Sequence, residues 1–398
     1  MPSPQPPRLD TLLQHTGIAP FDPRTGAAPV ALPAMRTSTV RFDSLASLDA
    51  AQARKAAGER AVTYGRMGMD THAALEDVFK QLESGSHCYL APSGLSAITL
   101  VFMSFLSAGD HALVADAAYG PVRLLDQEVL ARMGITVTYF SPRHDDIAAL
   151  VRPNTRLLYV ESPGSLLFEM LDLPALAAAA RRHGLILAAD NTWGSGYIYK
   201  PLELGAQVSV VAGTKYVGGH SDLMLGAVVT NDAALAQRLN HTQYAMGYSV
   251  SADDVWLALR GVRTLPLRMA RHAASALRVA EWLQARPEVV RVYHPALAGD
   301  AGYALWQRDC TGSNGMMAVA LRLPHEQGRR FVDSLRLFGI GFSWGGFESL
   351  AQWIEPAYLS AHRYWQGDAP TVVRLHIGLE SPEDIIADLE QALERAGA

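Results

Sequence analysis

Short apolar segments alternate with amphipathic segments along the middle of the chain. Each apolar segment is only a few residues long and rich in Val, Ile, Leu and Ala, which is the pattern of strands buried on both faces. The sequence predicts strands at 111–116, 135–140, 156–161, 185–190, 207–212 and 225–230, with helices at 121–133, 145–151 and 173–183. This βαβ alternation predicts a mainly parallel sheet covered by helices on both faces.

The chain before this alternation follows a different pattern. Residues 8–65 are punctuated by proline and glycine, and only 44–58 has a helical pattern. We therefore predict an arm that must bury itself against something else, with an extended start at the prolines of positions 2, 4, 6 and 7. A helix is predicted from Thr71, and a second, strongly apolar helix is predicted to end near Leu106.

The chain after the alternation predicts a second, smaller domain. A long helical pattern begins near Ser251, and Pro266 is predicted to kink or divide it. Strands are predicted at 289–293, 315–323, 341–344 and 372–378, and a last helix is predicted from a capping-box pattern at Ser381 to about Ala396. We expect an arm over residues 1–65, a large domain over 66–260 and a C-terminal domain over 261–398.

Composition and charge narrow the classes of function. The 34 Lys and Arg are interspersed with 39 Asp and Glu, so there is no basic stripe for binding nucleic acid. Cys88 and Cys310 are too few for a disulfide framework and have no metal-binding spacing, which favours a reducing cytoplasm. The sequence shows neither the apolar core of a signal peptide nor an apolar run of about 18 residues, so neither secretion nor a membrane span is expected.

Lys215 is the strongest candidate for chemistry. It follows an apolar strand and precedes a Gly-Gly turn at 218–219, while Asp190 ends another apolar strand 25 residues earlier. An isolated lysine in a loop is usually a surface residue, but two parallel strands would bring this amine and this carboxylate to the same edge of the sheet. A lysine that forms a Schiff base and an acid that pairs with a pyridine nitrogen are the two groups that pyridoxal phosphate requires.

Two further segments could bind an anion. Gly94 and Leu95 begin a predicted helix, so their amides and the positive end of the helix dipole would suit a phosphate. Tyr64 and Arg66 would point to the same side of an extended chain. Each signal is weak alone, because a Ser-Gly pair before a helix is usually a plain cap and the other segment is usually a surface turn.

Seven motifs in order resemble those of the pyridoxal-phosphate-dependent enzymes of cysteine and methionine metabolism. The resemblance extends from about residue 9 to the last helix. The motifs are Tyr64-x-Arg66, Ser93-Gly94-Leu95, Tyr119, Asp190-Asn191-Thr192-Trp193, Thr214-Lys215 followed by GGHSD, SWGGFESL at 343–350 and RLHIGLE at 374–380.

The resemblance implies an architecture and an assembly. The fold would be the α/β fold of aspartate aminotransferase (fold type I), with a mostly parallel seven-stranded sheet in a cofactor-binding domain over 66–260 and a smaller α/β domain after it. The assembly would be a homotetramer built as a pair of dimers, with active sites at the dimer interface. The arm would then bury itself against a neighbouring subunit.

The resemblance also implies the residues that bind pyridoxal phosphate. Lys215 would carry it, Asp190 would bind its ring nitrogen and Tyr119 would stack on its ring. The residues implied to hold its phosphate are Gly94, Leu95 and Thr214 of one subunit together with Tyr64 and Arg66 of its neighbour.

Within the family the motifs most resemble the bacterial enzymes that cleave cystathionine at the β-carbon to homocysteine, pyruvate and ammonia in methionine biosynthesis. Lys215 would remove the Cα proton, and Lys215 or Tyr119 would return a proton to the leaving sulfur. Arg374 would bind the substrate carboxylate with help from Ser343. The residues implied to border the substrate are Trp344, Tyr244 and Tyr64. Cysteine and cystine share the same amino-acid head and are further expected substrates.

Two local sequences favour a β-acting enzyme over the alternative, a γ-acting relative. Relatives that act at the γ-carbon have Ser-Leu-Gly-Gly where this chain has SWGG at 343–346, and Glu-Ser-Pro-Thr-Asn where it has ESPGS at 161–165. One departure from the family is Ala212, where many relatives have a phosphate-binding serine. Ser209 could replace that serine only if the strand end bends. A nucleotide-dependent oxidoreductase is disfavoured because the sequence has neither GxGxxG after a first strand nor GxxxxGK[ST].

Overall fold

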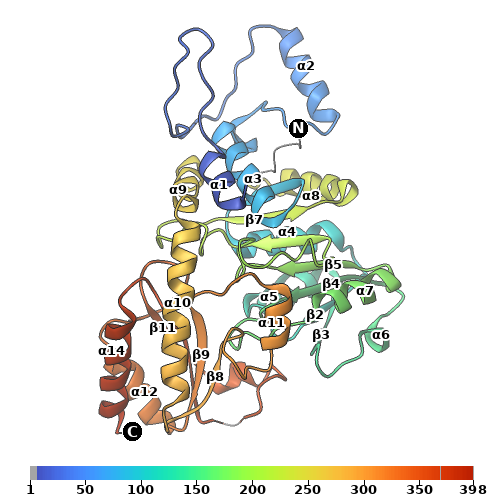
Figure 1. Ribbon diagram of the computed structural model, residues 1–398. Helices are drawn as coiled ribbons and strands as arrows, with labels where there is room; N and C mark the ends of the chain where they lie inside the picture. Colours follow the sequence, from blue (N-terminus) through green and yellow to red (C-terminus); the bar gives the residue numbers. More distant parts are fainter. Residues whose placement is uncertain (1–6, 368, 398) are drawn as a thin grey trace, which may run out of the picture.

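The computed structural model describes residues 7–367 and 369–397, and Figure 1 shows how they are arranged. Residues 1–6, which include three of the prolines that predict an extended start, lie outside this part of the chain. Two sheets organise the described residues, and the long helix α10 (Leu265–Gln284) connects them.

The large sheet has 7 strands in the order β1-β7-β6-β5-β4-β2-β3. The strands are β1 (His87–Ala91), β2 (His111–Ala115), β3 (Thr136–Phe140), β4 (Thr155–Glu161), β5 (Ile186–Asp190), β6 (Val208–Val211) and β7 (Gly226–Thr230). Strand β7 is antiparallel to β1 and β6, and the other neighbours are parallel. The predicted α/β fold with a mostly parallel sheet is confirmed, although β1 was not among the predicted strands.

Strands β2, β6 and β7 are buried on both faces, which explains why they are mostly apolar. On β4, Leu157 and Tyr159 pack with α4 (Gly94–Phe105) and α8 (Ala233–Ala245). Leu158 and Val160 point the other way and pack with α6 (Ile147–Leu150) and α7 (Leu173–His183). The helix predicted at 121–133 is α5 (Pro121–Leu125) continued by a π-helical turn (Asp126–Leu130) and a 3-10 turn (Ala131–Met133).

The small sheet has 5 strands in the order β10-β11-β12-β9-β8. They are β8 (Val289–Tyr293), β9 (Met316–Leu321), β10 (Gly339–Ile340), β11 (Leu350–Ile354) and β12 (Thr371–His376). One face packs against α10, α12 (His325–Ser334) and α14 (Pro382–Ala396). The opposite face joins a core shared with α3 (Asp70–Glu83) and α9 (Ala252–Val262), so it faces the large domain. The remaining helices here are α11 (Tyr303–Asp309) and α13 (Pro356–Leu359).

Three predictions in this half of the chain met different outcomes. Pro266 lies in the first turn of α10 and divides the helical pattern into α9 and α10, as predicted. The strand predicted at 341–344 is wrong, because Ser343 has a φ of +82°, which no strand residue adopts. Strand β11 follows that loop instead. Ser381 is the N-cap of α14 but makes no capping bond with its side chain, so the predicted capping box is absent.

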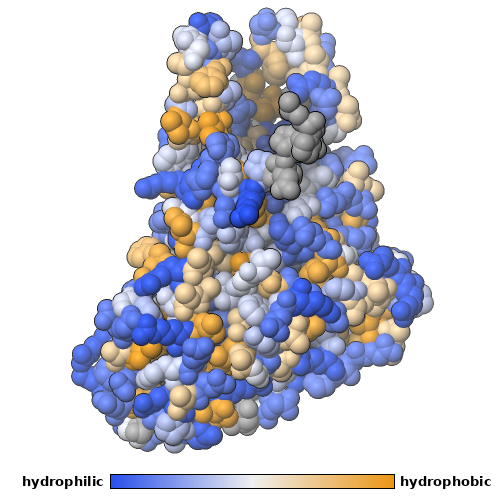
Figure 2. Space-filling model, viewed as in Figure 1, coloured by the Kyte–Doolittle hydropathy of each residue, from blue (hydrophilic) through white to orange (hydrophobic). Residues whose placement is uncertain are grey.

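The N-terminal arm is only partly attached to the rest of this chain. It contains α1 (Leu9–His15), which the sequence did not predict, and α2 (Leu45–Ala56), which it did. Leu13 of α1 is fully buried, whereas α2 buries no residue. Phe21 and Val30 are 75% and 85% exposed. Figures 1 and 2 show α2 and the loop beside it projecting at the top, with apolar side chains on their surface. The expected domain boundaries at 65/66 and 260/261 stay predictions.

Candidate active site

The carboxyl ends of β4 and β5 bring two carboxyl groups together. Glu161 and Asp190 are the last residues of their strands and are paired in the sheet register. The Oδ1 of Asp190 accepts hydrogen bonds from the amide of Thr192 at 2.9 Å and from its hydroxyl at 2.6 Å, and Oδ2 accepts one from the Tyr159 hydroxyl at 3.2 Å. These donors fix the orientation of the Asp190 carboxyl group.

Burial controls the protonation of both acids. It raises the pKa of Glu161 well above its usual range, and the neighbouring Asp190 adds to that effect. Burial also raises the pKa of Asp190, while the bonds from Thr192 oppose the change. Two adjacent carboxyl groups resist being charged together, so we assign the neutral form to Glu161 and the negative charge to Asp190. A cationic group beside Asp190 would stabilise that charge.

Lys215 lies beyond the end of β6, beside the loop that precedes β11. Its Nζ donates a hydrogen bond to the Ser343 hydroxyl at 2.6 Å and lies 5.2 Å from the centre of the Trp344 ring. Burial, with the nearby Arg374 cation, lowers the pKa of Lys215 to about 8. A much larger fraction of this amine is therefore uncharged near neutral pH than for an ordinary lysine.

The loop that carries Ser343 and Trp344 is in direct contact with the Lys215 backbone. A Cβ atom on Gly345 would lie 2.9 Å from the carbonyl carbon of Lys215, and Gly345 has a φ of +89°. Both facts require glycine at this position. The indole of Trp344 packs against the Tyr216 ring with 5.5 Å between centres. This contact explains the SWGG sequence at 343–346.

Arg374 and Tyr119 lie at the same edge. Arg374 comes from β12, is 9% exposed and donates from Nη2 to the Ser343 carbonyl at 2.9 Å. Burial lowers the pKa of its guanidinium to about 10, which still leaves it charged at neutral pH. The amide of Tyr119 donates to Oε2 of Glu161 at 2.6 Å. Burial raises the pKa of the Tyr119 phenol, so it remains protonated.

The start of α4 lies where the sequence predicts an anion-binding site. Ser93 caps the helix by accepting a bond from the Ser96 amide at 3.1 Å, and Gly94 and Leu95 follow as its first residues. A Cβ atom on Gly94 would lie 2.6 Å from that of Ala212, so the helix start packs directly on the segment before Lys215. An anion bound there would lie next to Lys215, in the positive field of the helix.

Hydroxyl groups near this seat have other partners. Thr214 donates to the Leu225 carbonyl at 3.1 Å and accepts from the Leu225 amide at 2.9 Å. Ser209 is buried and donates to Oε2 of Glu83 at 2.7 Å. Ser209 pairs regularly with Ala189 and Val229 in the sheet, so the bend that would let it replace the serine missing at Ala212 is not seen. The Ala212 amide instead donates to the Thr192 hydroxyl at 2.9 Å.

Arg66 and Tyr244 form a separate group, and Tyr64 lies two residues before Arg66 in the chain. Arg66 donates to the Tyr244 carbonyl at 3.0 Å and lies over the Tyr244 ring, 4.7 Å from its centre. Arg66 and Tyr244 line a cavity of about 580 Å³ beside α2, α3, β1 and α8. Tyr64 is 49% exposed. Within 7–367 and 369–397, no recorded contact links these residues to Lys215 or Trp344. The family resemblance implies Tyr244 beside the substrate with Trp344, whereas within one subunit Tyr244 lies against Arg66.

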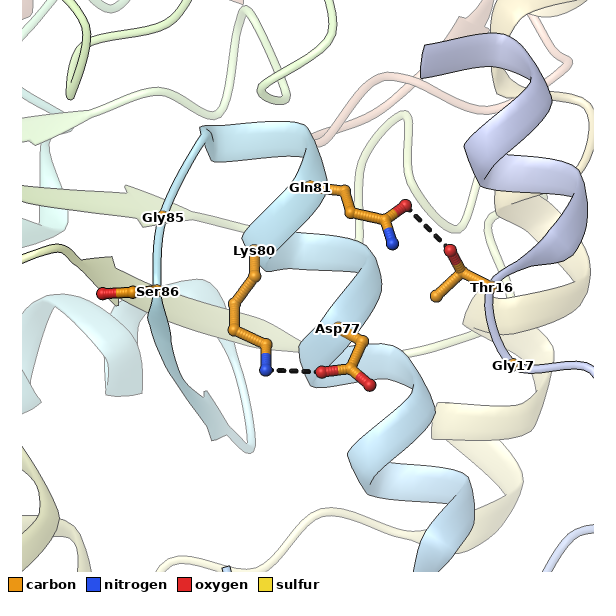
Figure 3. Close-up of a pocket in the computed structure, with 7 residues that line it drawn as sticks. All are labelled: Thr16, Gly17, Asp77, Lys80, Gln81, Gly85 and Ser86. Atoms are coloured by element: carbon orange, nitrogen blue, oxygen red, sulfur yellow. Dashed lines mark hydrogen bonds and ion pairs between the residues drawn. The ribbon is translucent and has the colours of Figure 1, made fainter. Parts of the chain in front are cut away.

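A further cavity, of about 570 Å³, lies between the end of α1 and α3 (Figure 3). Thr16 donates to Gln81 at 2.8 Å and Lys80 pairs with Asp77 at 2.5 Å, so the polar side chains drawn there largely bind one another. None of the predicted site residues lines it. The described residues contain neither a group of three potential metal ligands nor a helix long and apolar enough to cross a membrane.

The sequence model of the family described as "Cys/Met metabolism PLP-dependent enzyme" matches residues 10–394. The chain belongs to this family. Members of the family use pyridoxal phosphate, and this chain is accordingly a pyridoxal-phosphate-dependent enzyme.

Several family members are similar over their full length. A cystathionine beta-lyase of Bordetella avium is 71% identical over 388 residues, covering 98% of both chains. A cystathionine beta-lyase of Haemophilus influenzae is 39% identical, covering 97% of this chain and 98% of the relative. The crystal structure of cystathionine gamma synthase from Xanthomonas oryzae pv. oryzae in complex with cystathionine is 32% identical, with a TM-score of 0.89 and 99% coverage of both chains.

The residues at the sheet edge fit the family's cofactor. An aldehyde requires an uncharged amine, which the lowered pKa of Lys215 provides. A pyridine nitrogen requires a fixed carboxylate, which Asp190 provides with its oriented oxygens. A phosphate requires amide donors, which the start of α4 provides close to Ala212.

Some residues of this family site had no assigned role in the sequence analysis. In the sequence, Glu161 is the last residue of the strand predicted at 156–161 and the first residue of ESPGS at 161–165. Thr192 and His376 lie inside family motifs, and Tyr159 lies inside the predicted strand at 156–161 without a feature that marks it. Position at the carboxyl end of a predicted parallel strand is the one sequence feature that could have indicated Glu161 as a site residue. The other contacts depend on which segments meet in three dimensions.

Proposed function

We propose that this protein cleaves L-cystathionine between the β-carbon and sulfur. With one water the products are homocysteine, pyruvate and ammonia, which balances all atoms. The observation that carries the proposal is the Lys215 amine, held at 2.6 Å by Ser343 beside Trp344 and Arg374. The 71% identity to a protein named cystathionine beta-lyase supports it.

The side chains at the carboxyl edge of the large sheet would have different roles in the reaction. Bound pyridoxal phosphate supplies an electron sink for the negative charge that develops at the substrate's Cα. Arg374 would bind the substrate carboxylate, and Asp190 would pair with the pyridine nitrogen. Lys215 in its uncharged form would remove the Cα proton, and Lys215 or Tyr119 would give a proton to the leaving sulfur.

The packing of Trp344 supports β-cleavage over γ-cleavage. The indole is fixed against Tyr216 and lies close to the Lys215 amine, so it limits the positions open to the substrate side chain. Cleavage at the γ-carbon needs a second proton removed, from the β-carbon, and therefore a second position relative to the base. The two structures named for a cystathionine gamma-lyase and a cystathionine gamma synthase are each only 32% identical to this chain.

Product analysis tests the proposal. Purified protein should release pyruvate from L-cystathionine, with little α-ketobutyrate, and should release pyruvate from cystine and cysteine more slowly. Release of α-ketobutyrate as the main keto acid would show γ-cleavage instead. An absence of keto acid from all three substrates would reject a carbon–sulfur lyase.

We also propose a homotetramer of two dimers in the cytoplasm. The projecting arm, its exposed Phe21 and Val30, and the cavity beside Arg66 and Tyr244 support a neighbouring subunit at this face. Tyr64, Arg66 and Tyr244 would then act together in the neighbour's site. Cys88 and Cys310 are unpaired, in keeping with a reducing compartment.

Mixing two inactive variants tests the shared site. Lys215→Ala and Arg66→Ala lie in groups that do not touch within one subunit. If Arg66 contributes to the neighbouring subunit's site, each mixed dimer should contain one site with both wild-type residues and one site with neither. Random mixing makes about half of the dimers mixed, so the mixture should regain up to about a quarter of the wild-type activity. Mass measurements should first show that the two variants have exchanged subunits. Mixed oligomers that are nevertheless inactive would place Arg66 in the active site of its own subunit.

Substitution of Arg374 is expected to weaken substrate binding. Arg374→Leu should raise KM for cystathionine about 10- to 100-fold, because a charge-assisted pair is lost. Arg374→Lys should recover only part of this, since an ammonium cannot form the two-pronged bond. Arg271→Leu is a matched control, because Arg271 is exposed and donates to the Glu380 carbonyl at 3.0 Å outside the site. Equal KM values for wild-type and Arg374→Leu protein would contradict the assignment.

The pKa of Lys215 predicts how the protein takes up its cofactor. Only the uncharged amine attacks an aldehyde, and the uncharged fraction grows as pH rises through about 8. The rate at which cofactor-free protein turns yellow after addition of pyridoxal phosphate should therefore rise with pH, with its midpoint near 8. A midpoint near 10, the ordinary value for lysine, would show that the pKa is not lowered.

A further inference from the structure

The loop at 343–348 is conformationally demanding. Ser343 has a φ of +82°, in a region that favours glycine, and Gly345 has a φ of +89°. Such a backbone persists only when its surroundings hold it there. The loop also determines where the Ser343 hydroxyl meets the Lys215 amine, so whatever holds the loop also determines the geometry of the site.

Strand β12 holds the loop through two side chains on one face. Arg374 donates to the Ser343 carbonyl at 2.9 Å. His376, two residues further along, accepts from the Gly345 amide through Nε2 at 3.1 Å and donates from Nδ1 to the Glu348 carbonyl at 3.0 Å. Residues two apart on a strand point to the same side, which is why one strand can bind three points of the loop.

The hydrogen bonds of His376 define its chemical form. The Gly345 amide can only donate, so Nε2 must be without a proton. The Glu348 carbonyl can only accept, so Nδ1 must carry the proton. The ring is 1% exposed and packs near Tyr216 and His272, with centres 6.0 Å and 5.2 Å away. Burial and the neighbouring His272 lower the pKa of His376 well below its usual value, in agreement with a neutral ring.

We propose that His376 is a positioning residue for the reaction at Lys215. By binding Gly345 and Glu348 it holds the loop in the one conformation that presents the Ser343 hydroxyl to Lys215 and the Ser343 carbonyl to Arg374. The loop also touches the Lys215 backbone at Gly345, so any shift of the loop shifts the lysine. The role in the reaction rests on the proposed lyase function, but the loop-holding role does not.

Three substitutions separate the two bonds of His376. His376→Leu removes both. His376→Gln places an amide oxygen where Nε2 lies and keeps an acceptor for Gly345, while His376→Asn places an amide nitrogen near Nδ1 and keeps a donor for Glu348. If His376→Leu does not fold, the two amide variants carry the test, because each leaves one of the buried bonds in place.

Hydrogen exchange measures the loop directly, with or without cofactor. In His376→Leu the backbone amides of 343–348 should exchange at least about tenfold faster, the change expected for loss of one ordinary hydrogen bond. The His376→Gln variant should protect Gly345 better than His376→Leu does. Unchanged exchange of this segment in a folded variant would overturn the proposal.

Kinetics then connect the loop to the reaction. His376→Leu should raise KM for cystathionine and lower kcat, each about tenfold, with partial rescue in His376→Gln. Combined with Ser343→Ala, its effect should be smaller than in the wild-type background, because both changes act through one loop. Fully additive effects would contradict action through Ser343. If wild-type protein does not cleave cystathionine, the proposed function fails while the exchange result still decides whether His376 holds the loop.

His111 provides a matched control. It is also a buried histidine with two side-chain bonds, to Thr155 at 2.8 Å and to Thr138 at 2.9 Å, but it begins β2 at the amino ends of the parallel strands. His111→Leu should lower thermal stability without changing KM or the exchange of 343–348. Equal changes in both variants would mean that His376 acts only through general stability.

Discussion

Lys215→Ala is expected to lose nearly all activity and the yellow colour of the bound cofactor. The structure places this amine against Ser343 and Trp344, with a pKa lowered to about 8. Losing both the covalent attachment and the base that removes the Cα proton should lower kcat at least about a thousandfold. Turnover of cystathionine and absorbance in the visible range check this. A variant that is still yellow and active would contradict the assignment.

Lys200 provides the matched control for this result. It is also a partly buried lysine of the large domain, and burial lowers its pKa as well. Its Nζ donates to the Leu82 carbonyl at 2.6 Å and to the Ser84 hydroxyl at 3.0 Å, so its role is to bind the end of α3. Lys200→Ala should lower stability and keep the colour. Loss of colour in both variants would show that unfolding, and not loss of the reacting amine, caused it.

The sequence predicted the large domain well because its strands are buried on both faces. Continuous apolar runs marked β2 to β7, and the residue after each run marked the edge where Asp190 and Lys215 meet. Strand β1 was missed because His87 and Cys88 at its start are not strongly apolar. It lies at the margin of the sheet, where only β7 pairs with it.

The loop at 343–348 is a segment whose structure the hydrophobic pattern of the sequence does not predict. The apolar pair Phe342 and Trp344 resembles part of a strand, and only the left-handed backbone of Ser343 and Gly345 rules this out. The contacts of Glu161 with the Tyr119 amide and of His376 with Gly345 join residues 42 and 31 positions apart. Such contacts depend on how strands and loops are packed, which hydrophobic periodicity does not encode. The family sequences include Glu161 and His376 but give these two residues no role.

Asp190→Asn is expected to have the second-largest effect. The carboxylate accepts three hydrogen bonds, two from Thr192 and one from Tyr159. An asparagine NH₂ group would face one of these donors and leave it unpaired, and the side chain could no longer stabilise a positive charge at the pyridine nitrogen. Removal of an oriented electrostatic partner from a buried site typically lowers kcat by about 10²- to 10³-fold. We expect a loss of this size, together with weaker retention of pyridoxal phosphate during dialysis.

Asp388→Asn is the matched control for that loss. Asp388 is also 5% exposed and accepts hydrogen bonds from the backbone, from Arg336 at 3.0 Å and Leu337 at 2.8 Å, but it lies on α14 in the small domain. Asp388→Asn should reduce thermal stability and retain the cofactor through dialysis. Asp190→Glu keeps the charge but adds a methylene in a packed site, so it should keep more activity than Asp190→Asn. If Asp190→Asn turned over cystathionine at the wild-type rate, the negative charge at this strand end would have no part in the reaction.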